Sequence, residues 1–146
     1  MIWDFYKTSG QSGQSLVEAV VVIGVVTVLV TGIIVGTTAS LRNINEGKTR
    51  SLALKYSQEG IEYARNLRNI GWTGFAEKSG VYCLDKTNVL TASANSVCPV
   101  NVDSIYIRSL TFTWVDPVMN VASKVAWDDG RGEHKSELTT NFTRWR

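Results

Sequence analysis

The chain has 146 residues, a formal net charge of +2 and a hydrophobic fraction of 44%. This length suits one modest folded domain, since domains typically run to about 100–150 residues. The charge is too mild to indicate a nucleic-acid-binding protein, whose surface carries strong basic clusters.

Residues 1–13, MIWDFYKTSGQSG, form a short segment with small residues at its end, including Gly10, Ser12 and Gly13. An apolar stretch follows almost at once. We interpret residues 1–13 as a leader that is removed by processing.

Residues 19–36, AVVVIGVVTVLVTGIIVG, contain no charged side chain. A helix over this stretch spans about 27 Å, close to the bilayer hydrocarbon thickness of about 30 Å. A secretory signal peptide has a shorter apolar run, of about 7–15 residues. We therefore predict that residues 14–38 are a transmembrane helix retained in the mature protein. The alternative is a removed signal, with mature protein beginning near Ala39.

Residues 39–70 continue the helical pattern in amphipathic form, because apolar side chains recur mostly every three to five residues. The recurring positions are Leu41, Ile44, Leu52, Tyr56, Ile61, Ala64, Leu67 and Ile70. One continuous helix from about Gln14 to Asn69 is therefore expected.

Residues 71–146 are expected to form a small β-rich head. Residues 71–74 indicate a helix exit, and the segment up to Pro99 is predicted to be a loop with one short strand near Val81–Leu84. From Ser104 onward, β-branched and aromatic runs predict three or four antiparallel strands. Asp129-Gly130 is a hairpin signal, and the alternative to a two-residue turn is a longer polar loop over Asp128 to Glu133. The predicted fold class is α+β, with one face of the sheet on the helix.

Two cysteines, Cys83 and Cys98, lie beyond the apolar stretch. They form a disulfide if the head occupies an oxidising compartment. The alternative is a pair of free thiols packed as small hydrophobic groups.

Residues 13–18, GQSLVE, stand directly before the charge-free run and resemble the type IV prepilin processing motif. In that family a membrane aspartyl peptidase cuts after a glycine, and the new first residue is usually N-methylated. The fifth mature residue is a glutamate. Cleavage after Gly13 makes Gln14 the first residue and Glu18 the fifth, whereas cleavage after Gly10 puts Ser15 fifth. Unlike most of the family, this leader is not strongly basic and its new terminus is not phenylalanine.

Glu18 is the residue to which the resemblance gives a role in assembly. A carboxylate in a lipid-embedded helix costs about 2.5–3.5 kcal/mol at the helix centre, so a cationic partner is expected. The resemblance implies that this partner is the amino group that cleavage creates. Pairing of the two charges would fix the register of packed helices. The alternative is an acid that reaches the headgroups and favours the positive helix N-terminus.

Gly32 and Gly36 form a G-x-x-x-G element, and Gly24 adds a further small surface. Such residues permit close helix approach in membranes, so we predict helix packing here. Ordinary glycine use in a membrane helix is the alternative.

A second, softer resemblance covers most of the chain. Residues 58–68, QEGIEYARNLR, with residues 124–127 and 138–140, look like minor pilins and type II secretion pseudopilins. This resemblance implies a pilin-like fold, a prepilin peptidase and other pilin or pseudopilin subunits as partners. It also implies a single-pass protein of the bacterial cytoplasmic membrane with an exported C-terminal head, which then enters a filament. The residues after the apolar stretch carry more positive than negative charge, with Arg42, Lys48 and Arg50 but only Glu46. Because positive residues tend to stay on the cytoplasmic side of a membrane, this balance by itself weakly favours the opposite orientation.

No enzyme motif stands in the sequence: there is no nucleophile elbow, phosphate-binding glycine loop or H-E-x-x-H zinc motif. The one histidine, His134, is expected to be a surface strand residue. We therefore predict a structural protein without catalytic residues, cofactor, metal or small-molecule substrate.

Two weaker interpretations concern charged residues of the head. Asp128, Asp129 and Glu133 offer calcium ligands, but a solvated turn is favoured. Arg108, with the terminal residues 144–146, could contact nucleic acid, although so few residues make this partner unlikely.

Two function hypotheses remain. The first is a minor pilin or pseudopilin that polymerises through its N-terminal helix. The second is a single-pass membrane-anchored binding module that does not polymerise. The sequence leaves open whether a filament would serve secretion, adhesion, motility or DNA uptake.

Overall fold

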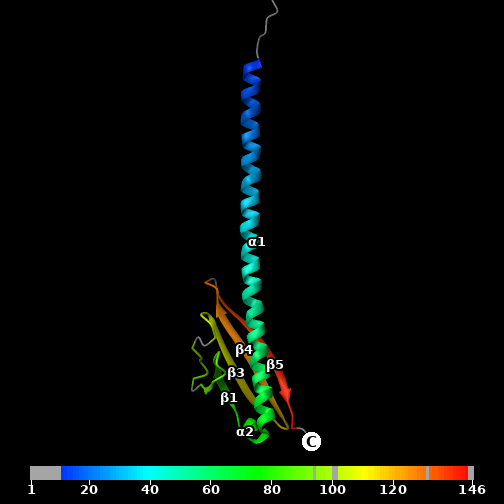
Figure 1. Cartoon of the computed structure of the whole chain (residues 1–146), viewed down its shortest axis with the longest axis vertical. Helices are drawn as coiled ribbons and strands as arrows, with labels where there is room; N and C mark the ends of the chain where they lie inside the picture. Colours follow the sequence, from blue (N-terminus) through cyan, green and yellow to red (C-terminus); the bar gives the residue numbers. More distant parts are fainter. Residues whose placement is uncertain (1–10, 94, 100–101, 131, 145–146) are drawn as a thin grey trace, which may run out of the picture. The chain divides into compact units, whose positions relative to one another are not determined.

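The computed structural model describes residues 11–93, 95–99, 102–130 and 132–144, with side chains from Ser15 onward. The chain divides into two compact units, Met1–Glu46 and Gly47–Arg146. One long helix, α1 (Gln11–Ile70), contributes to both (Figure 1). Each unit is described below by itself.

The first unit consists of the N-terminal part of α1. Every described side chain from Ser15 to Glu46 is exposed, including the whole charge-free run. Within the part of the chain that the structure describes, this is the one helix that is long and apolar enough to cross a membrane. The criteria are the length of the helix and its apolar composition, and a signal sequence near the N-terminus meets both of them as well.

The second unit begins with the remainder of α1, which ends at Ile70 as the sequence predicts. Gly71 is extended, and a short helix, α2 (Trp72–Ala76), follows it. The sequence analysis did not predict α2. Its one buried residue, Phe75, closes the end of the core and contacts the rings of Phe112 and Phe142.

A five-stranded antiparallel sheet forms the rest of the unit, in the order β2-β1-β3-β4-β5 (Figure 1). The strands are β1 (Gly80–Leu84), β2 (Leu90–Ala92), β3 (Tyr106–Val115), β4 (Val118–Asp128) and β5 (Glu133–Phe142). The last three follow one another as a meander. The α+β class predicted from the sequence is confirmed.

One face of the sheet packs against α1, because side chains alternate along each strand. In β3, Tyr106, Arg108, Leu110 and Phe112 are buried, while the residues between them are half-buried. The main apolar cluster joins α1 and α2 to the sheet through Ile61, Ala64, Phe75, Leu84, Leu110, Phe112, Met119, Val121 and Phe142.

One detail of the sheet, the strand β2, differs from the sequence-based prediction. Three strands follow Ser104, as expected, but β2 pairs with β1 inside the segment that was predicted to be loop. At the last hairpin, residues 129–132 separate β4 from β5, so the turn is longer than the Asp129-Gly130 pair. Gly130 has φ +80°, a conformation that L side chains rarely adopt.

Gly60 is a point of close approach between α1 and the sheet. A Cβ added there would lie 2.3 Å from Ser123 Oγ and 3.1 Å from Leu110 Cδ2. The helix can therefore reach β4 only because residue 60 has no side chain.

We expect Gly60→Ala to destabilise the head by about 1–3 kcal/mol through overpacking, despite the better helix propensity of alanine. Gly47→Ala is the matched control, since nothing lies within 4 Å of a Cβ there. Thermal melting of the full chain in detergent, followed by tryptophan fluorescence, measures both.

Ser123→Ala is a second variant for the same experiment, because Ser123 Oγ is buried without a hydrogen-bond partner among the described residues. We expect this change to be neutral or stabilising alone and to recover part of the Gly60→Ala loss. Equal melting of Gly60→Ala and the parent chain would contradict the close approach.

Candidate functional site

The predicted processing site falls largely where side chains are not described. Residues 1–10 of the predicted leader lie outside the described residues. Gly13 and Gln14 belong to the first turn of α1, and the structure describes only their backbone. Cleavage after Gly13 and methylation of Gln14 therefore stay predictions.

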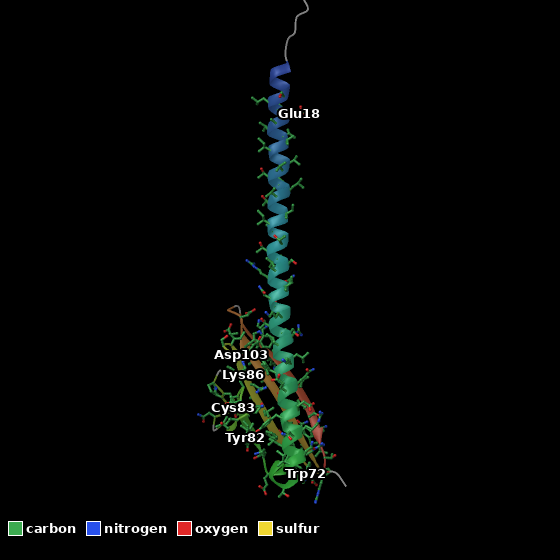
Figure 2. The ribbon with its side chains drawn as sticks, viewed as in Figure 1. Glu18, Trp72, Tyr82, Cys83, Lys86 and Asp103 are labelled. Atoms are coloured by element: carbon green, nitrogen blue, oxygen red, sulfur yellow. A yellow bond between two sulfur atoms is a disulfide. The ribbon has the colours of Figure 1, made fainter. Side chains whose placement is uncertain are left out.

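Glu18 lies in α1 one turn after that position and is exposed (Figure 2). Among the described residues, none forms an ion pair with it. All the side chains that follow it, as far as Leu41, are uncharged. Glu18 thus stands as a single carboxylate at the entrance of an apolar helical surface, available to a cation from another molecule.

Three glycines interrupt this apolar surface at Gly24, Gly32 and Gly36. A Cβ added at any of them would meet nothing within 4 Å, so the folded chain itself does not need glycine there. The nearby Thr27 and Thr31 hydroxyls donate to the Ile23 and Thr27 carbonyl oxygens, at 2.7 and 2.8 Å. These hydroxyls bond within the helix, and the open space at the three glycines would allow a neighbouring helix to approach closely, so helix packing there stays a prediction.

We expect Gly32→Leu combined with Gly36→Leu to weaken self-association in lipid vesicles about tenfold, while the head melts unchanged. Val35→Leu, on the same stretch, is the matched control. Fluorescence energy transfer between labelled copies measures the association. Unchanged transfer in the double variant would show that the glycines are incidental.

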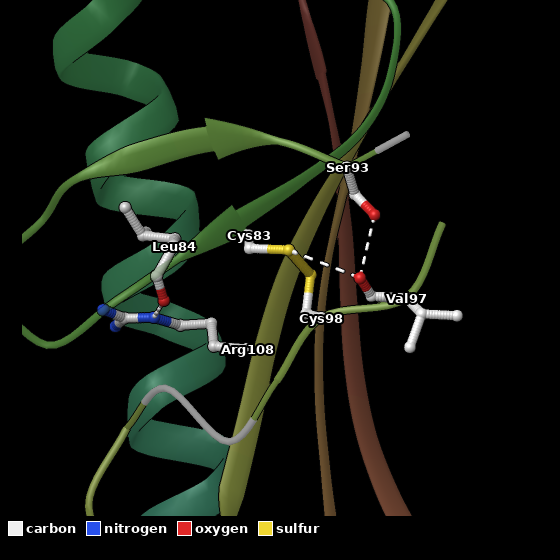
Figure 3. The surroundings of a disulfide bond; sticks show 6 residues. All are labelled: Cys83, Leu84, Ser93, Val97, Cys98 and Arg108. Carbon is white, nitrogen blue, oxygen red and sulfur yellow. Dashed lines mark hydrogen bonds between the residues drawn. A yellow bond between two sulfur atoms is a disulfide. The ribbon is translucent and has the colours of Figure 1, made fainter. Parts of the chain in front are cut away.

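In the head, Cys83 and Cys98 form a disulfide with a Cα–Cα distance of 5.5 Å (Figure 3). The bond joins β1 to the segment after β2 and closes a loop with a sequence separation of 15. Closure of such a loop contributes about 3 kcal/mol on the chain-entropy account. The structure describes no free cysteine.

Arg108 corrects one sequence-based interpretation. The sequence analysis considered it as a nucleic-acid contact, but its side chain is only 1% exposed and lies beneath the β1–β2 turn. Its guanidinium donates to the carbonyl oxygens of Leu84 (3.1 Å), Asp85 and Tyr56 (3.5 Å), and pairs with Glu59 at 3.3 Å. Burial lowers the pKa of Arg108 from its ordinary value. Arg108 is therefore an internal anchor.

A second polar network fixes the loop that the disulfide closes. Asp103 accepts hydrogen bonds from Tyr56 of α1 and from Lys86 of the β1–β2 turn. The Lys86 hydrogen bond is the main cause that lowers the pKa of Asp103, and the Asp103 hydrogen bond raises the pKa of Tyr56 to about 12. The sequence analysis did not foresee these contacts, because their partners stand 17 and 47 positions apart.

The acidic turn and the single histidine were the residues considered for a metal site. Among the described residues, no group of three or more His, Cys, Asp or Glu side chains is placed to hold a metal ion. His134 stacks on the Trp127 ring, with centroids 5.5 Å apart, and its Nε2 lies 3.3 Å from Asp129 Oδ2. His134 is a half-exposed strand residue, and a loop aspartate supports it.

Comparison with protein-family models, with curated proteins and with solved structures found no match to this chain. The functional argument therefore rests on the chain's own motif and architecture.

Proposed function

We propose that this chain is a minor pilin or pseudopilin, a structural subunit that a prepilin peptidase processes and that polymerises through its N-terminal helix. One observation carries the proposal. The residues GQSLVE stand directly before a charge-free run of α1, and every described side chain of that run is exposed. An apolar helix of this kind needs a lipid or protein environment to cover it.

The architecture of the second unit supports the same proposal. The last turns of α1 pack on an antiparallel sheet of five strands, the α+β arrangement that the resemblance to pilins and pseudopilins implies. The disulfide between Cys83 and Cys98 fits a head that is exported to an oxidising compartment. In this proposal the partners are the peptidase, other subunits and the membrane, and the reaction at Gly13 is carried out on the chain rather than by it.

Co-expression with a prepilin peptidase tests the proposal. We expect a peptidase-dependent shift to lower mass on a denaturing gel. Gly13→Leu abolishes the shift, because the peptidase of the family that the chain resembles cuts after glycine. Gly10→Leu is the matched control and leaves the shift intact. A chain that stays uncleaved would favour a single-pass membrane anchor that does not polymerise.

A further inference from the structure

The two cysteines of the disulfide differ in their burial. Cys98 is buried, with 7% of its surface exposed, whereas Cys83 is half-buried and lines a cavity of about 480 Å³. Cys98 does not line that cavity. A reagent that enters the cavity therefore meets the sulfur of Cys83.

The outer wall of the cavity is the β2 edge and the residues after it. Thr91 stands directly opposite Cys83 in the β1–β2 pairing, so both side chains lie on the same face of the sheet. Ser93 Oγ donates to the Val97 carbonyl oxygen at 2.9 Å (Figure 3). The same carbonyl oxygen lies 3.9 Å from Cys83 Sγ, a van der Waals contact because a disulfide sulfur carries no proton.

We propose that this cavity is a thiol-exchange site, through which a small-molecule thiol attacks the disulfide at Cys83. The thiolate forms a new bond to Cys83 Sγ, the Cys83–Cys98 bond breaks, and the sulfur of Cys98 leaves as a thiolate that takes a proton from water. The exchange needs no further oxidant or reductant. The thiolate attacks Cys83 rather than Cys98, because access to the sulfur is one of the factors that set exchange rates.

The charge of the cavity determines which thiols it favours. Asp85 is the one charged residue of its described lining. Asp85 Oδ1 accepts hydrogen bonds from the backbone N–H groups of Thr87 and Val89, each at 2.8 Å. The hydrogen bond from Val89 N–H is the main cause that lowers the pKa of this carboxyl, so it is ionised at neutral pH. An ionised carboxylate favours a cationic thiol such as cysteamine over an anionic one such as thioglycolate.

We expect opening of the bond to release the segment around Cys98, while the sheet and the β1–β2 turn stay in place. Ser93 N–H still donates to the Val81 carbonyl oxygen at 2.9 Å, and Asp103 still pairs with Lys86. The core clusters do not include Cys83. The disulfide is therefore a reversible closure of a surface loop, and this inference holds whether or not the chain polymerises.

Incubation of the full chain in detergent with cysteamine tests the proposal, followed by quenching with N-ethylmaleimide and peptide mass mapping. We expect the cysteamine adduct on Cys83 and the maleimide on Cys98. Thr91→Trp, which covers Cys83 from the opposite strand, slows the exchange about tenfold. Thr113→Trp is the matched control, because Thr113 is equally exposed on β3 and does not line the cavity.

At equal thiolate concentration and low salt, we expect cysteamine to react about threefold faster than thioglycolate, and Asp85→Asn to remove the preference. An adduct on Cys98, equal labelling of both cysteines, or unchanged exchange in Thr91→Trp would overturn the proposal. A folded chain that does not react, beside a urea-unfolded chain that does, would overturn it as well.

Discussion

Glu18→Ala is expected to abolish assembly while the chain still inserts in the membrane and is still cleaved. The carboxylate has no ion-pair partner among the described residues of its own chain, and an apolar surface follows it. In the proposed filament it pairs with the amino group that cleavage creates at Gln14. Both charges are costly in lipid alone, so their pairing would fix the register of neighbouring helices.

The magnitude of this effect follows from the cost of the unpaired charge. Removal of one partner leaves the amino group uncompensated, so we expect filament yield to fall about tenfold or more in the sheared surface fraction. Glu46→Ala removes an acid beyond the apolar run and is the matched control. Filaments in normal amount from Glu18→Ala would rule out the register role and favour an acid that reaches the headgroups.

Arg108→Ala is expected to destabilise the head by about 3–5 kcal/mol, through the lost packing of a buried side chain and the loss of its hydrogen bonds. The side chain is almost fully buried, and its loss leaves a cavity and removes the guanidinium donor from the carbonyl oxygens of Leu84 and Asp85, although Asp85 O still accepts from Asn88 N–H at 3.2 Å. Tyr56 loses a weaker bond. The β1–β2 turn loses its attachment to β3, so the loop closed by the disulfide loosens as well.

Melting of the full chain in detergent measures this prediction, and a loss of this size lowers Tm by more than about 10 °C. Arg65→Ala is the matched control: Arg65 pairs with Glu62 on the helix surface and is half-exposed, so its loss costs less than about 1 kcal/mol. Similar melting of the two variants would contradict the role of Arg108 as an internal anchor.

The elements with strong local patterns could be predicted from the sequence. The end of α1, the strand near Val81–Leu84 and the three long strands after Ser104 all follow from apolar spacing and β-branched runs. The short elements could not: β2 has three residues and α2 has five. Both are held by tertiary contacts, β2 by its pairing with β1 and α2 by the burial of Phe75.

Arg108 shows a signal that the sequence did contain. It alternates with Tyr106, Leu110 and Phe112 in one strand, so the two-residue period assigns it to the buried face. The sequence analysis considered Arg108 only as a nucleic-acid contact and did not apply that period to it. Its burial is tolerable because carbonyl oxygens of α1 and of the β1–β2 turn accept its hydrogen bonds. These acceptors stand 52 and 23–24 residues from Arg108 in the sequence, so the local pattern does not reveal them.

The residues proposed to act in assembly could be named from the sequence, but their contacts would lie between copies of the chain. Gly24, Gly32 and Gly36 lie on an exposed helix surface, which agrees with a packing role but also with ordinary helix composition. Glu18 acts in the proposal through a partner that only a second copy or a processed terminus provides. Such roles belong to the assembled state, so a test needs the processed chain in its membrane.

The N-terminal mass of the mature protein tests the central proposal most directly. The protein is extracted from membranes that contain a prepilin peptidase and measured by mass spectrometry. We predict a terminus at Gln14, with the added mass of one methyl group. An intact Met1 would contradict processing, and a terminus beyond Gly36 would contradict the filament proposal altogether, because the apolar helix would then be a removed signal.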